Sequence, residues 1–115
     1  MNLEKLREQW LAEEAVAHIH GWDFSHLEGR WEDEEILPWD YRTEVLAALR
    51  PDSRILDMDT GGGEFLLSLN HPHENTAATE AYPPNVELCR QTLLPLGIDF
   101  RSGDGKKPPF EDTGF

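Results

Sequence analysis

The residues of this chain that are best suited to chemistry lie in a glycine turn at 57–63, directly after an apolar run. Two carboxylates, a hydroxyl group and three consecutive glycines occur within this short stretch. Glycine lets the backbone approach a bulky ligand without a side chain in the way, and a following helix offers free N–H groups at its positive end. We therefore predict that the turn is the floor of a cofactor site. The cofactor-contacting residues predicted there are Asp57, Asp59, Thr60, Gly61 and Gly63.

Two further carboxylates follow the next two strands that the sequence predicts. In all, three strands are expected, at 54–58, 76–80 and 98–102. Asp57, Glu80 and Asp104 then stand at three successive strand exits. In an open parallel sheet, ligands bind beyond the carboxyl ends of the strands. Because a carboxylate accepts the hydroxyl protons of a ribose or the amine of a base, we expect an adenosine-type ligand.

Helices are predicted before and between these strands. They are expected at 2–19, at 39–49, around Phe65, Leu66 and Leu69, and from Pro83 to near Pro95. Alternating strands and helices with short links imply right-handed crossovers, and therefore an α/β fold with a parallel sheet. Residues 1–38 are expected to form a helix that covers the sheet and an aromatic, acidic loop, in which the acidic run at 32–35 is a solvated face. Residues 39–115 are expected to bind the cofactor.

The charge and length of the chain exclude several classes of function. Its 115 residues suffice for one domain, and its net charge of -13 repels polyanions, which disfavours nucleic acid as a partner. No apolar run reaches the about 20 residues that span a bilayer, and no secretion signal is evident, so we expect a cytoplasmic protein without membrane contact. The single cysteine, Cys89, is expected to be a buried packing residue. The histidines lack partners at metal-ligand spacing, so no metal site is predicted.

The glycine turn also carries the motif of a known family. Leu56, Asp57, Gly61 and Gly63 match an apolar pair followed by an acid and by glycines at alternating positions. In this respect the sequence resembles the class I, Rossmann-like S-adenosylmethionine-dependent methyltransferases. The resemblance covers about residues 40–115.

The resemblance implies S-adenosylmethionine as the cofactor and a partial Rossmann-like, three-layer fold. By the same likeness, Glu80 looks like the acid that holds the cofactor ribose, and Asp104 looks like the acid that meets the adenine amine. Residues 109–115 are similar to the segment before the fourth of the family's seven strands. The chain is therefore expected to be the cofactor-binding half of a methyltransferase domain, with an unknown methyl acceptor and no turnover by itself. The unpaired edge of the strand at 54–58 is expected to allow a homodimer.

Asp59 stands where the family has a glycine. Its side chain would either hinder the closest approach of the cofactor or attract the sulfonium or amino group, and we favour hindrance on steric grounds. A non-catalytic module that binds an adenosine ligand, or a relic that binds nothing, are alternatives. The acids at 57 and 59 are also similar to the Asp-x-Asp of haloacid-dehalogenase-like phosphatases, but Thr60 sits one place too early for that pattern. Dinucleotide, phosphate-loop and calcium-loop motifs fit less well.

Overall fold

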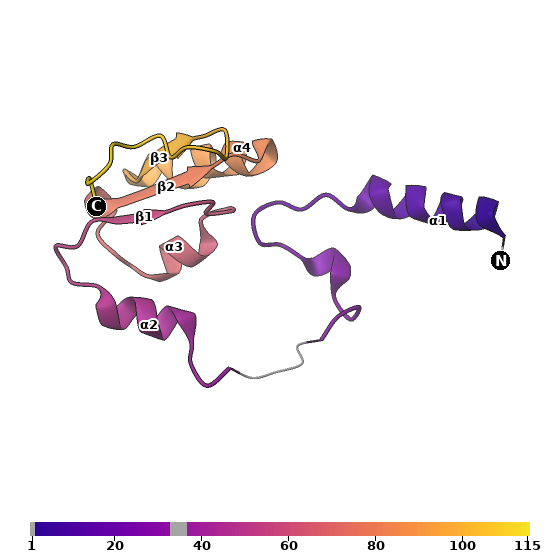
Figure 1. The fold of residues 1–115 in the computed structure, drawn as a ribbon, viewed down its shortest axis with the longest axis horizontal. Helices are drawn as coiled ribbons and strands as arrows, with labels where there is room; N and C mark the ends of the chain where they lie inside the picture. The colour runs from indigo at the N-terminus through magenta and orange to yellow at the C-terminus, as the bar shows by residue number, and fades with distance from the viewer. Residues whose placement is uncertain (1, 33–36) are drawn as a thin grey trace.

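The computed structural model describes residues 2–32 and 37–115. In chain order, the elements are α1 (Leu3–Val16), η1 (Ser25–Leu27), α2 (Tyr41–Ala48), β1 (Ile55–Asp57), α3 (Glu64–Ser68), η2 (His73–Asn75), β2 (Thr76–Glu80), α4 (Pro83–Thr92), η3 (Leu94–Leu96) and β3 (Asp99–Ser102). Apart from its first residue, the acidic run at 32–35 lies outside the described residues. Figure 1 shows the elements from α2 onward gathered around the sheet, with α1 standing apart from them.

The three strands form one parallel sheet in the order β1-β2-β3, which confirms the prediction of a parallel sheet. Strand β2 is central, has the predicted bounds and is buried at every residue. Strands β1 and β3 are shorter than predicted. Within the described chain β1 pairs only with β2, so its other edge is unpaired, as expected. Dimerisation through this edge stays a prediction.

The hydrophobic core lies between one face of the sheet and the helices α3 and α4. It consists of Leu66, Leu69, Ala78, Val86, Cys89, Leu93, Ile98 and Phe100. Cys89 and Leu93 are fully buried, which confirms that Cys89 is a packing residue. Val45 and Leu49 bring α2 against the same cluster. Full burial of a side chain such as Leu93 contributes about 1.5–3 kcal/mol, so this cluster is the main source of stability.

The opposite face of the sheet is crossed by the C-terminal segment 108–115 rather than by helices. Thr79 and Arg101 pair in register between the core-facing residues of β2 and β3, so their side chains point to this second face. The guanidinium of Arg101 donates to the Pro109 carbonyl (2.9 Å) and lies 4.1 Å from the centre of the Phe110 ring. Consecutive prolines in this segment disfavour a helix. The described helices that pack on the sheet share one face, so the structure shows an open parallel sheet with flanking helices, and the Rossmann-like, three-layer arrangement stays a prediction.

The N-terminal helix does not cover the sheet, contrary to the prediction for 2–19. None of the residues of α1 is buried. Leu3, Leu6 and Trp10 share one side of the helix, but Leu11 and Val16 project from other sides, so no continuous apolar face forms. The protruding helix makes the molecule elongated, with a radius of gyration of 18.0 Å. About 13 Å is typical of a compact chain of this length.

Candidate functional site

The glycine turn begins where β1 ends and is fastened to β2. Thr60 is buried, its amide donates to the Thr79 carbonyl (2.9 Å), and its hydroxyl donates to the Asp57 carboxylate (2.8 Å). Asp59 has a φ of 57°, in the left-handed region that the turn requires. Its amide donates to the Thr79 hydroxyl (3.2 Å). A non-glycine residue at such a φ costs on the order of 1 kcal/mol, so Asp59 is strained where a glycine would not be.

Glu80, predicted to hold a ribose, holds the glycine turn in the structure, and the ribose contact stays a prediction. One carboxylate oxygen accepts the amide of Gly61 at 2.7 Å. The other accepts the amides of Ala81 (3.0 Å) and Tyr82 (3.1 Å) at the start of α4. Glu80 is only 7% exposed. An ionised carboxylate offers about four acceptor positions, so a hydroxyl group of a ligand would still find a free lone pair on Glu80.

Asp104, predicted to meet an adenine amine, is exposed in the loop that follows β3. One oxygen of its carboxylate accepts the amides of Lys106 (2.8 Å) and Lys107 (3.3 Å). These backbone hydrogen bonds lower the pKa of Asp104. Asp side chains commonly bond the backbone two residues on, and this local turn holds Asp104 away from the pocket described next.

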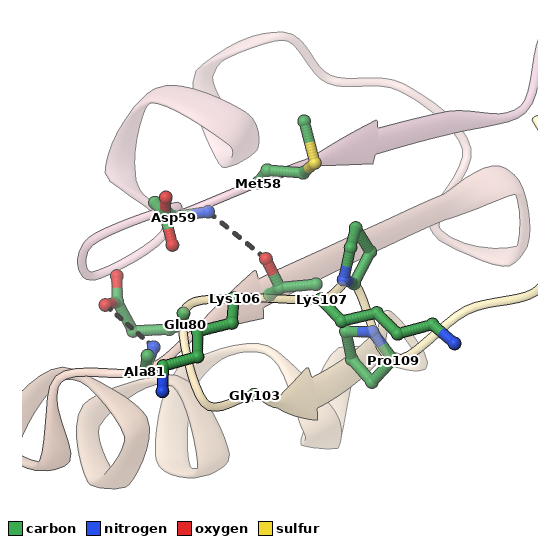
Figure 2. A pocket seen from close by; sticks show the side chains of 11 residues that line it. Met58, Asp59, Glu80, Ala81, Gly103, Lys106, Lys107 and Pro109 are labelled. Carbon is green, nitrogen blue, oxygen red and sulfur yellow. Dashed lines mark hydrogen bonds between the residues drawn. The ribbon is translucent and has the colours of Figure 1, made fainter.

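A pocket of about 150 Å³ opens at the carboxyl ends of the strands. Figure 2 shows Asp59 and Glu80 on one side of it and Lys107 and Pro109 on the other. The lining consists of Met58, Asp59, Thr79, Glu80, Ala81, Gly103, Gly105, Lys106, Lys107, Pro108 and Pro109. Ligand pockets are commonly about 300–1,000 Å³, so the loop after β3 leaves room for only part of an adenosine ligand.

The remaining predicted site residues lie elsewhere. Asp57 borders a separate, largely apolar pocket of about 250 Å³ that also contacts Tyr41 and Phe65. Thr60 and the glycines of the turn are buried beneath other side chains. The structure therefore brings Asp59 and Glu80 into one pocket and leaves the other predicted residues outside its lining.

Each glycine of the turn faces a group of the protein itself. A Cβ on Gly61, which has a φ of 70°, would lie 2.5 Å from the indole nitrogen of Trp22. A Cβ on Gly62 would collide with the Glu64 carboxylate, and one on Gly63 would lie 2.7 Å from a methyl group of Leu93. Internal packing therefore explains Gly61 and Gly63, whereas the Glu64 carboxylate beside Gly62 is the end of an exposed, flexible side chain that can move.

The electrostatic environment of the turn is negative. Burial raises the pKa of Asp57, and the nearby charges of Asp59 and Glu80 raise it further, while the hydrogen bond from Thr60 opposes them. Burial, together with the neighbouring carboxylates, raises the pKa of the Cys89 thiol to about 11. A region of negative charge favours a cationic ligand and disfavours a phosphate group.

Sequence reasoning missed the wall formed by the loop after β3. The two lysines at 106 and 107 were visible in the sequence, but nothing in their spacing showed that the loop folds back over the strand ends. It also missed Trp22 as the residue that covers Gly61. The signal for that contact is the pair Gly21 and Trp22, a glycine and a large aromatic residue within a polar stretch.

Comparisons of the chain with protein-family models, with curated proteins and with solved structures give no match. Across residues 2–32 and 37–115, we find no helix with the length and apolar character needed to cross a bilayer. In the same residues, no three His, Cys, Asp or Glu side chains are grouped so that they could hold a metal ion. Any proposal about function therefore depends on the geometry of the site.

Proposed function

We propose that this chain binds S-adenosylmethionine at the carboxyl edge of its sheet, as the cofactor-binding portion of a methyltransferase. One observation carries the proposal: the hydrogen bond from Gly61 to Glu80 joins the turn after β1 to the end of β2, directly beside a pocket. Ligands of open parallel sheets bind at this edge. The pocket holds two carboxylates, Asp59 and Glu80, that can accept ribose hydroxyl groups or an amine.

The charge of the glycine turn supports S-adenosylmethionine over ligands that contain phosphate, whereas the opposite wall of the pocket carries Lys106 and Lys107. The sulfonium and amino groups of this cofactor are cationic, and the turn is surrounded by Asp57, Asp59, Glu64 and Glu80. A dinucleotide or a phosphate ester would bring negative charge to the same place. For this reason, and because Asp57 borders the apolar pocket rather than the pocket at the strand ends, we do not propose the phosphatase alternative, in which Asp57 would attack a phosphate group.

Binding of a whole adenosyl group requires the loop after β3 to move outward. This loop is exposed from Asp104 to Pro108 and contains glycines at 103 and 105, of which Gly105 has a φ of 76°. Few contacts hold such a loop, so its displacement costs little compared with a change in the core. In the proposed complex, Glu80 keeps its bonds to the turn and accepts a ribose hydroxyl on a free lone pair.

Methyl transfer from this cofactor requires mainly that the reactants are aligned. The sulfonium group is already activated, and methyl transfer needs a nucleophile in line with the bond between sulfur and the methyl carbon. The residues of this chain would bind and orient the cofactor and exclude water from it. We assign no residue to the methyl acceptor or to a catalytic base.

Isothermal titration calorimetry with S-adenosylmethionine tests the proposal. We expect saturable binding at one site per chain, and weaker binding by Glu80→Gln, which loses carboxylate charge beside the turn. Glu74→Gln is the matched control, because Glu74 is exposed in η2, at the opposite end of β2. No heat of binding from the natural chain or from Asp59→Gly would refute the proposal.

The relic alternative is favoured by the packing of the glycines and by the strain at Asp59. Binding by Asp59→Gly but not by the natural chain would support the relic, because it would show that the site survives and that Asp59 blocks it. Binding by both proteins would support a functional module.

A further inference from the structure

A two-residue strap, Gly21 and Trp22, crosses the outer side of the glycine turn. Its three N–H groups all find acceptors around the turn. The Gly21 amide donates to the side chain of Asn85 at 2.6 Å, and the Trp22 amide lies 3.5 Å from the Glu64 carboxylate. The Trp22 indole N–H donates to the Thr60 carbonyl at 3.2 Å.

The strap and the turn fit together through glycines on both sides. The indole of Trp22 stands where a Cβ on Gly61 would be, at 2.5 Å from that position. Gly21 is buried with a φ of 59°, and a Cβ on it would collide with the Glu64 carboxylate. The open face of Gly61, where a bulky ligand could approach the backbone, is therefore occupied by the protein's own side chain.

The strap holds residues 2–32, which are otherwise mostly exposed, against the rest of the molecule. Of residues 2–32, only Gly21 is buried, and 57% of Trp22 remains exposed. A hydrogen bond contributes a modest net free energy, and ordering of the backbone costs a comparable amount per residue. The closed and open states of the strap are therefore close in free energy, so that a ligand could displace it.

We propose that the strap is an autoinhibitory contact, which competes with the ligand for the glycine turn. The inference depends on the proposed function, because the competing ligand is S-adenosylmethionine. When the strap is closed, the indole of Trp22 covers Gly61 and uses the Thr60 carbonyl. When the strap is open, both become available to the cationic end of the ligand. The apparent affinity is then the intrinsic affinity reduced by the fraction of open molecules.

Titration calorimetry on the full chain tests the competition with two variants that open the strap in different ways. Trp22→Ala removes the indole. Gly21→Ala keeps Trp22 and places a Cβ against the Glu64 carboxylate and 3.1 Å from the Gly62 Cα, so that both the side chain and the backbone of the turn oppose the closed strap. If nine in ten molecules are closed, each variant should bind S-adenosylmethionine about tenfold more tightly. Trp31→Ala is the control for loss of an exposed indole, since Trp31 is 61% exposed.

Gly29→Ala is the control for the backbone strain of Gly21→Ala. Gly29 has a φ of 78°, and a Cβ on it would have no neighbour within 4 Å. Both control variants should bind with the affinity of the natural chain. Amide hydrogen exchange gives an independent measurement, because the Gly21 amide should exchange faster once the ligand displaces the strap from Asn85.

The outcomes separate the inference from the proposed function. Tighter binding by Trp22→Ala and Gly21→Ala, with faster exchange at Gly21, supports the autoinhibitory strap. Equal or weaker binding by these variants, or slower exchange at Gly21 with ligand, overturns the inference and leaves the proposed function intact. No binding by the natural chain or by either variant overturns the proposed function and the inference with it.

Discussion

Replacement of Gly63 by alanine tests whether the glycine turn is shaped by packing against α4. Gly63 has a φ of 85°, and a Cβ there would lie 2.7 Å from a methyl group of the fully buried Leu93. Gly97 is a matched control within the same chain. Its φ is 86°, and a Cβ on it would have no neighbour within 4 Å. The two substitutions therefore share the backbone strain and differ in the steric contact.

The expected losses in the free energy of unfolding follow from the backbone strain and the steric contact. A non-glycine residue in the left-handed region costs about 1 kcal/mol, which applies to both variants. Overpacking of a close-packed core adds about 1–3 kcal/mol, which applies only to Gly63→Ala. We therefore expect the free energy of unfolding to fall by about 2–4 kcal/mol in Gly63→Ala and by about 1 kcal/mol in Gly97→Ala.

Urea unfolding monitored by circular dichroism measures the loss of unfolding free energy in both variants. A third variant isolates the steric contact between position 63 and Leu93. Leu93→Val shortens the facing side chain and by itself costs about 1 kcal/mol. In that background, Gly63→Ala should cost no more than Gly97→Ala, because the colliding methyl group has been withdrawn. Equal losses for the two glycine variants in the natural background would refute the packing explanation of the turn.

Three further outcomes are expected. Asp57→Asn should raise the melting temperature at neutral pH, because burial raises the pKa of Asp57 in the folded state and its ionisation then opposes folding. This gain should vanish in melts well below the unfolded-state pKa of about 3.9, where the carboxyl is protonated in both states. Cys89 should resist alkylation in the native chain at pH 8 and react once urea unfolds it, because its thiol pKa is about 11. Light scattering should show dimers at high concentration if β1 pairs through its free edge, and a strict monomer would contradict that prediction.

The elements around the sheet could be predicted because their signals are local. Strand β2 has the predicted bounds, and α4 begins at Pro83 as predicted, because proline suits the first turn of a helix. The burial of Cys89 followed from its place on the apolar face of α4. Periodicity identifies such faces directly, which is why the core was largely predictable.

The contacts of the candidate site could not be predicted in the same way. Nothing local shows that Glu80 accepts the amide of Gly61. The bonds from the following amides to Asp104 are local and typical of Asp in a turn, but a role of Asp104 at a ligand was inferred instead. A carboxylate at a strand end can face a ligand or the backbone, and the choice depends on which N–H groups lie nearby after folding. The third layer was inferred from the family resemblance. In the structure, the C-terminal prolines and the bond from Arg101 to Pro109 place residues 108–115 across that face of the sheet.

The glycine turn is a single thickness of backbone between two side chains from distant parts of the sequence. On its inner side the Cys89 thiol donates to the Gly61 carbonyl (3.1 Å), and on its outer side Trp22 lies against the same residue. A displacement of the Gly61 peptide by the side chain at position 89 would therefore also move Trp22 at the surface. A bulkier side chain in place of Cys89 would push the peptide outward and expel the indole, so that the fluorescence of Trp22 would report how tightly the interior is filled.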